Sequence, residues 1–292
     1  MPAVAVVSIR EKAVRAGAFG LLVVGTVALS ACIINGRDGP IQDDPAAFSW
    51  NAPISAPATV FVRNTNGSVE VRPSTDGNVR VTTDVKWHRG DPKTDLKFET
   101  KNGADGITIC ALWDGGQCSA AHYKSTADGV TKNLLNHGTD ATVTFTVYVP
   151  TGVKVDVFTV NGSIGIAATA PVKAQTINGS IKVATSVGPV DGETVNGSVD
   201  VRMTTLAGDG PVRAHTITGT AAAYLPEKFD GSVEITSAIG GISSDFPGTT
   251  AKDGDKKFTA VLGTGSRTID IATVTGSAEL HKLKADGTVA AP

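Results

Sequence analysis

Charge and aromatic residues are both scarce in this sequence of 292 residues. Asp, Glu, Lys and Arg make up 18% of it, and Phe, Trp and Tyr only 5%. The formal net charge of -2 leaves no basic patch of the kind that phosphate backbones require, so we expect no nucleic-acid partner. Disorder is disfavoured because 41% of the residues are hydrophobic. Helix formers are sparse beside valine, threonine and glycine, which argues against a long-helix protein.

Patterns that carry catalysis or metal binding are missing as well. The five histidines show no metal-ligand spacing, and the sequence contains neither a G-x-S-x-G elbow nor a phosphate-binding loop. His215 alternates with Ala214 and Thr216, which predicts an outward position on a solvated face. The sequence therefore predicts no catalytic residues, no metal site and no cofactor.

The first 31 residues differ in composition from the rest. Arg10, Lys12 and Arg15 form a positive start, and an uncharged apolar run over 16–31 follows. That run is shorter than the ~20 residues that cross a bilayer as a helix, and it ends in small residues. The pattern is typical of a secretory signal over 1–31, with an uncleaved anchor and a soluble secreted form as alternatives.

The end of this segment, Leu29-Ser30-Ala31-Cys32, resembles the lipobox of bacterial lipoproteins. The resemblance implies cleavage before Cys32 and a diacylglycerol on its sulfur, so that the membrane becomes a partner through the lipid. It places the protein in the cell envelope, outside the cytoplasm. Residues 32–58 are rich in Pro, Asp, Gly and Ala, which predicts that the lipidated cysteine is followed by a flexible tether.

The two remaining cysteines are Cys110 and Cys118. An even pair in an exported chain favours a disulfide, and Asp114-Gly115-Gly116 between them supplies a turn. Two free thiols, or a metal pair without other ligands, are weaker alternatives. The pair lies within 88–140, a less regular stretch that we interpret as a hairpin insertion with a mobile loop.

One phrase recurs in the second half of the chain. It reads TVNGSIGI at 159–166, TINGSIKV at 176–183 and TVNGSVDV at 194–201. Weaker copies stand at 212–223 and 269–280, a degenerate one at 233–244, and an early, isolated one at 60–71. A period near 20 residues is typical of a solenoid or array. We therefore assign 59–282 to one repeat domain, followed by a C-terminal tail over 283–292.

The apolar pattern changes phase inside each copy, which predicts two short strands joined by a sharp bend at Asn-Gly. Stacked coils of an all-β solenoid satisfy this pattern, and so does an antiparallel meander of Asn-Gly hairpins. We favour the solenoid, because near-identical consecutive copies are what stacking on a neighbour would select. The predicted bend residues are Asn66, Gly67, Asn161, Gly162, Asn178, Gly179, Asn196, Gly197, Gly219 and Gly276.

The asparagine row has two interpretations. It could bind a sugar or an ion, or its amides could bond to one another down the stack and satisfy the bend, since Asn tolerates positive φ. We favour the second interpretation.

Segments 145–166 and 223–235 resemble the bacterial putative-adhesin family of β-repeat domains. The shared marks are Val149-Pro150-Thr151-Gly152, the repeated T-[VI]-x-G-x-[IV] phrase and Leu225-Pro226. The resemblance covers 59–282, and 88–140 matches poorly. It implies a right-handed β-helix-like fold and an envelope location.

Three functions can be separated on these grounds. The first is a non-catalytic envelope lipoprotein whose solenoid surface serves adhesion or surface recognition, with a glycan or cell-wall polymer as partner. The second is an envelope structural or stress-response component that binds another envelope protein. The third, a polysaccharide-active enzyme, is less favoured because no acid recurs at one position of adjacent repeats.

Overall fold

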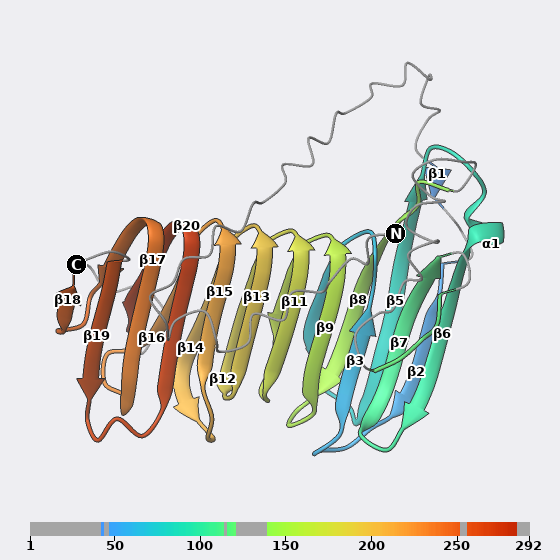
Figure 1. Ribbon diagram of the computed structural model, residues 1–292. Helices are drawn as coiled ribbons and strands as arrows, with labels where there is room; N and C mark the ends of the chain where they lie inside the picture. Colours follow the sequence, from blue (N-terminus) through green and yellow to red (C-terminus); the bar gives the residue numbers. More distant parts are fainter. Residues whose placement is uncertain (1–41, 44–46, 114–115, 121–138, 252–255, 285–292) are drawn as a thin grey trace.

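The computed structural model describes residues 42–43, 47–113, 116–120, 139–251 and 256–284. These residues form an all-β structure whose only helix is the short α1 (Pro92–Asp95). The strands stand side by side in a long row (Figure 1). The predicted signal, Cys32 and most of the C-terminal tail lie outside the described residues. Among the described residues, none belongs to a helix with the length and apolarity needed to span a bilayer.

Each of four copies of the phrase forms one coil of two strands, which meet at an Asn-Gly bend or, in the fourth coil, at Thr218-Gly219. Apolar side chains of both strands point inward, and polar ones alternate outward. The coils are β9 (Lys154–Asn161) with β10 (Ile164–Ala167), β11 (Val172–Asn178) with β12 (Ile181–Val187), β13 (Val190–Asn196) with β14 (Val199–Ala207), and β15 (Val212–Thr218) with β16 (Ala221–Pro226).

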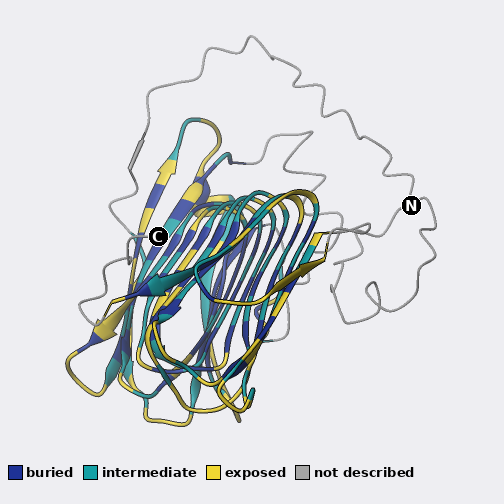
Figure 2. Ribbon diagram, turned by 90° about the vertical axis from the view of Figure 1, so that its left-hand side faces the viewer, coloured by how far each residue is buried: buried dark blue, intermediate teal, exposed yellow. Residues whose placement is uncertain are grey.

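Successive coils pair in parallel and in register. Asn178 lies beside Asn161 on one side and beside Asn196 on the other. The stacked solenoid is therefore confirmed, and the antiparallel meander is wrong. Seen along the stack, the coils overlie one another around a buried interior (Figure 2).

The stack has two walls, which we name by their strands. Wall A contains the strands before the bend, and wall B contains those after it. Wall A comprises β7 (Gly106–Trp113), β3 (Thr59–Arg63), β9, β11, β13, β15 and the first parts of β20 (Thr268–Leu283) and β17 (Gly231–Ser244). Wall B comprises β8 (Thr142–Pro150), β4 (Val69–Ser74), β10, β12, β14, β16 and the remaining parts of β20 and β17.

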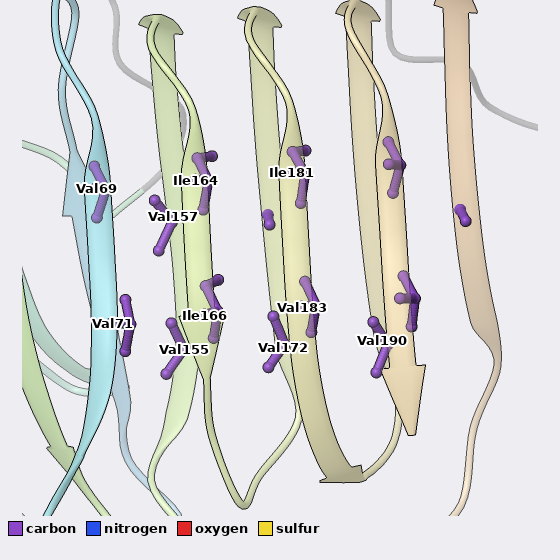
Figure 3. Close-up of a cluster of buried hydrophobic side chains, with 14 of the residues drawn as sticks. Val69, Val71, Val155, Val157, Ile164, Ile166, Val172, Ile181, Val183 and Val190 are labelled. Carbon is purple, nitrogen blue, oxygen red and sulfur yellow. The ribbon is translucent and has the colours of Figure 1, made fainter. Parts of the chain in front are cut away.

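The core lies between the walls. Val155 and Val157 of β9 approach Ile164 and Ile166 of β10 across the coil, and the next coils repeat the arrangement (Figure 3). These side chains are almost wholly buried. Because each coil alone would leave its apolar side chains at the open ends, the stack is stable only as an array.

The order of coils at the C-terminal end differs from the order in the sequence. β20 (Thr268–Leu283) lies between the β15–β16 coil and β17 (Gly231–Ser244). The degenerate copy at 233–244 is thus the last described coil. β19 (Lys256–Leu262) pairs antiparallel with the first part of β17, and β18 (Thr249–Ala251) pairs with β19.

The early copy at 60–71 is not isolated in space. β3 (Thr59–Arg63) pairs in parallel with β9, and β4 (Val69–Ser74) pairs in parallel with β10. The copy is separated from the others only along the sequence, because the chain returns to the same stack after a long excursion.

The N-terminal end of wall B is built from strands that the repeat does not predict. β8 (Thr142–Pro150) pairs in parallel with β4, and β5 (Asn78–Trp87) pairs antiparallel with β8. β2 (Ser49–Pro53) and β1 (Gln42–Asp43) pair antiparallel with β5. Part of the predicted tether is therefore an edge strand, since Phe48 and Trp50 pack against the core.

The described part of the predicted insertion contains a hairpin. β6 (Leu96–Gly103) and β7 (Gly106–Trp113) form an antiparallel hairpin, and β7 stacks in parallel on β3. Cys110 of β7 is bonded to Cys118, with the two Cα atoms 5.6 Å apart, which confirms the predicted disulfide.

Candidate functional site

Every glycine of the bend touches the coil next to it. A Cβ built on Gly179 would lie 2.0 Å from the carbonyl oxygen of Gly162, and one on Gly197 would lie 2.1 Å from that of Gly179. No side chain fits at that distance. The Gly162 N–H donates to the carbonyl of Asn178 at 2.9 Å, which ties the two bends together. Glycine is therefore required by the close approach of the backbones.

The threonine before each bend bonds to the neighbouring glycine. The buried hydroxyl of Thr176 donates to the carbonyl of Gly162 at 3.0 Å, and that of Thr194 donates to the carbonyl of Gly179 at 2.9 Å. Thr216 repeats the contact. The threonine hydroxyl therefore gives a hydrogen-bond partner to a glycine carbonyl that the bend would otherwise leave buried and unpaired.

The asparagines bond to one another. Asn178 Nδ2 donates to Asn161 Oδ1 at 2.8 Å, and Asn196 Nδ2 donates to Asn178 Oδ1 at 3.0 Å. Asn66 differs, because its amide donates to the carbonyl of Ala141. The same column continues as Thr218 and Thr275 in later coils. The structural interpretation of the asparagine row accounts for these contacts.

The serine after each glycine is an acceptor. The Ser180 N–H donates to Ser163 Oγ at 3.3 Å, and the Ser198 N–H donates to Ser180 Oγ at 3.2 Å. All the predicted bend residues therefore lie at one corner, which we call the motif corner. Its Thr, Asn, Gly and Ser hold one coil on the next.

One letter of the phrase has no such partner. The Val or Ile between Thr and Asn follows an inward threonine, so it points out of wall A. We call these side chains the outer stripe. They are Val160, Ile177, Val195, Ile217 and Val274. The sequence pattern alone placed the change of phase directly after the threonine, which grouped this residue with the inward side chains of the second strand. That placement is wrong, because the strand continues past this residue and changes direction only at the bend.

The stripe is partly exposed. The first four members are half-buried by their neighbours in the stack, and Val274 is 48% exposed. Beside them runs a column of mostly polar residues, in which Gln175 Nε2 donates to Glu193 Oε2 at 2.7 Å. The stripe therefore lies between this column and the amides of the motif corner.

A third column on wall A alternates in charge. Its members in stacking order are Asp156, Lys173, Asp191, Arg213 and Asp270. Burial, followed by the charge of Glu193, raises the pKa of Asp191, although Arg213 and Lys173 oppose the shift. The alternation leaves this wall without a strong field of one sign.

His215 points outward from wall A, as predicted, but the prediction that it is solvated is wrong. Its side chain is 13% exposed, because neighbouring coils cover it. Nε2 lies 3.0 Å from Asp270 Oδ2 in an ion pair whose orientation falls short of hydrogen-bond geometry. Burial alone lowers the pKa of His215, but Asp270, Glu193 and Asp191 outweigh it, so the pKa lies above its usual 6.5.

The disulfide segment covers the N-terminal end of the outer face of wall A. Cys110, Leu112, Cys118 and Phe158 form a small buried cluster, and Val160 packs against it. Arg63 is buried nearby and pairs with Asp156 at 2.9 Å, while its Nη2 donates to the carbonyl of Ala120. This segment therefore packs on the outside of the solenoid, over the first member of the outer stripe.

The outer face of wall B carries an aromatic and charged group. The guanidinium of Arg202 lies 4.3 Å from the centroid of the Tyr224 ring, which stacks on His281 with centroids 5.0 Å apart. Arg202 also pairs with Asp200 at 3.1 Å. Burial and the charge of Asp200 raise the pKa of Tyr224. These residues satisfy one another across three coils.

Metal-ligating residues do not gather in the part of the chain that the structure describes, where no three His, Cys, Asp or Glu side chains could share an ion. Glu279 and Asp245 both contact His281, at 3.1 and 3.3 Å. A shallow hollow beside β19 is lined by Pro247, Gly248, Thr249 and residues 259–262, and it holds no titratable side chain.

Comparison with solved structures finds neighbours of low sequence identity, among them the following three. A putative cell adhesion protein from Clostridium sporogenes is 11% identical and aligns over 82% of this chain and 100% of its own, with a TM-score of 0.45. Putative adhesins from Bacteroides fragilis and Parabacteroides merdae are 10% and 9% identical. Each aligns over 82% of this chain and over 98% and 96% of its own, with TM-scores of 0.27 and 0.20.

At these scores the likeness carries no argument about function. No family model matches the sequence, and no curated protein matches it.

Proposed function

We propose that this protein is a non-catalytic, lipid-anchored protein of the bacterial cell envelope. Its solenoid walls would recognise a polymer or surface outside the cytoplasm, such as a glycan or a cell-wall polymer. The observation that carries the proposal is the in-register stacking of the coils, which turns single outward residues into long columns on a stiff surface. The motif itself is occupied in holding that surface together.

The disulfide supports a location outside the cytoplasm. The Cys110–Cys118 bond is of the kind that persists in oxidising compartments and is rare in the reducing cytosol. The proposed anchor at Cys32 would place the wall surfaces close to the membrane, at the end of the segment that precedes β2.

Binding of the mature chain to arrays tests the proposal. Residues 33–292, with the cysteine pair oxidised, are applied to arrays of glycans and cell-wall polymers and to intact cell-wall particles. We expect saturable binding to at least one class, and the same chain unfolded by reduction and urea is the control. An array without any saturable signal would count against surface recognition.

Lipidation is tested separately. Metabolic labelling with a fatty-acid analogue should label the full chain in a bacterial host, and Cys32→Ser should abolish the label. Labelling that persists in the Cys32→Ser variant would contradict the proposed anchor.

One observation favours a second candidate, an envelope component that binds another protein. Among the described residues, β17 from Gly240 to Ser244 has a strand partner on one side only, which is β20. Free sheet edges accept strands from other chains. Lys256 donates to the Gly240 carbonyl and shields part of this edge. Cross-linking in cells at Ser243 would capture such a partner, and deletion of the gene should then alter the envelope-stress response.

A further inference from the structure

We propose that the outer stripe of wall A is a track for a linear, uncharged polysaccharide. The polymer would lie across the strands, along the stack, with one sugar ring near each coil. This inference rests on the proposed function and deepens it by naming the surface and the class of ligand.

The first argument concerns the position of the motif between Thr and Asn, a Val or Ile whose side chain makes no hydrogen bond between coils. Thr, Asn, Gly and Ser each make a contact to the next coil, whereas the Val or Ile between Thr and Asn points outward. An outward position in a strand is ordinarily polar when water covers it. Five consecutive coils nevertheless place a branched apolar side chain there. The result is a continuous apolar strip on an otherwise polar wall.

The second argument is that the first member of the outer stripe is already covered by another part of the chain. Val160, in the first coil of the strip, packs against the disulfide cluster. Among the described residues, that cluster does not extend to Ile177, Val195 or Ile217. Burying their exposed apolar surface would be favourable, because it removes that surface from water. These three members therefore present the surface that a ligand would cover.

The third argument is the chemistry on either side of the strip. The exposed side chains of Asn178, Asn196 and Thr218 follow one edge, and Gln175 and Glu193 follow the other. An apolar floor with a few placed donors and acceptors is the usual lining of a small-molecule site. A sugar ring offers the matching surfaces, because its C–H face is apolar and its hydroxyls lie around the rim.

The fourth argument is the repeat distance. Stacked coils lie about 4.8 Å apart, as strands of a sheet do, so a ligand along the stack must repeat at a similar interval. An extended peptide repeats at about 3.4 Å per residue and would lose register. Each residue of a linear chain of pyranose sugars lengthens the chain by about the width of one ring, and that length is close to the spacing between two stacked coils. Nucleic acid is disfavoured because the third column of wall A alternates in charge and offers no continuous row of cations to a phosphate backbone.

The experiment compares matched variants on the two walls. In the stripe variant, Ile177→Thr, Val195→Thr and Ile217→Thr are combined, since threonine keeps the branched shape and the strand preference. Tyr224→Thr is the control on wall B. Binding to uncharged oligosaccharides of glucose and of N-acetylglucosamine, at several lengths, is measured by calorimetry. Carboxylated oligosaccharides of the same lengths are compared.

We expect affinity for the uncharged chains to rise with length until three coils are covered. The stripe variant should bind about tenfold more weakly or worse, because three apolar contacts are lost, while the control binds as the parent does. Circular dichroism should show both variants folded. A stripe variant that does not fold would be replaced by the single change Val195→Thr, for which a smaller loss is expected.

Three results would overturn the track. One is undiminished binding by the folded stripe variant, and another is loss of binding by Tyr224→Thr alone. The third is binding of only charged polymers or proteins, which would leave surface recognition standing. An absence of any ligand on the arrays would instead remove the proposed function itself.

Discussion

The two corners of each coil follow different rules. At the motif corner the link between the two strands has the same length in all four two-strand coils, at 162–163, 179–180, 197–198 and 219–220. At the opposite corner the links differ, at 168–171, 188–189 and 208–211. The register also shifts near the opposite corner, between Thr185 and Val187.

The difference follows from backbone contact. At the motif corner the glycine of one coil touches the carbonyl of the next at a distance that excludes a Cβ. At the opposite corner, the nearest atom to a Cβ built on Gly188 is the end of the Arg267 side chain, at 2.9 Å. A side chain can move, whereas a stacked backbone cannot. The residue type is therefore restricted at the motif corner, where the backbones of two coils touch. The length of the link can vary at the opposite corner, where they do not.

The largest expected effect comes from adding a methyl group to the motif corner. Gly179→Ala should lower the free energy of unfolding by about 3 kcal/mol, because the added Cβ overlaps the Gly162 carbonyl and the coils must separate. Urea unfolding followed by circular dichroism measures the loss.

Two alanine variants act as controls for that measurement. Gly188→Ala at the opposite corner should cost about 1 kcal/mol, since a side chain yields. Gly77→Ala, which meets nothing within 4 Å, should be close to neutral. Equal losses at Gly179 and Gly188 would remove the distinction between the corners.

A smaller effect is expected from the buried hydroxyl. Thr194→Val keeps the shape but removes the donor to the Gly179 carbonyl, so unfolding should become easier by about 1.5 kcal/mol. At the opposite corner, Thr205 donates to the Ser186 carbonyl from an exposed position. Thr205→Val should therefore change the unfolding free energy by less than about 0.5 kcal/mol, and a larger loss there than at Thr194 would contradict the comparison.

The amide column should contribute less than the buried threonine. Asn178→Ala removes one donated and one accepted bond, but both are exposed to water. We expect a loss of about 1 kcal/mol or less in the same unfolding experiment. Asn178→Thr reproduces the side chain of Thr218 and should recover part of it. If Asn178→Ala lowered the free energy of unfolding more than Thr194→Val does, the amide bonds rather than the threonine hydroxyls would be the main stabilising contacts of the corner.

The smallest expected effect is a pH dependence of the stability, and it should arise from the strand before the motif corner rather than from the corner itself. The motif corner has no titratable side chain, but His215 stands in β15 with a pKa above 6.5. Its protonated form is favoured by folding, so its contribution is full below pH 6.5 and is lost as pH rises through the folded pKa.

Thermal unfolding between pH 6 and 8.5 measures this contribution. The parent should lose stability as pH rises, and His215→Gln should show a flatter profile. Gly188→Ala should keep the slope of the parent. A slope unchanged by His215→Gln would show that the ion pair with Asp270 does not stabilise the wall.

Much of the fold could be predicted from short patterns in the sequence. The change of apolar phase indicated two strands and a bend, the near-constant period indicated stacking, and Cys110 with Cys118 indicated a disulfide. Each of these features is local, because a coil buries its apolar side chains in the same way wherever it lies in the stack. The role of the [VI] position was missed, since outward and inward valines look alike until the bend is placed.

The order of the coils was decided only by the tertiary structure. The sequence by itself determined what one coil is, through the inward valines and the Asn-Gly bend. It did not show that β3 and β4 join β9 and β10, that β20 enters before β17, or that His215 is covered by its neighbours. The physical reason is that every coil offers nearly the same edge to the next. Which edges meet depends on long-range chain closure, and no short window of sequence contains that information.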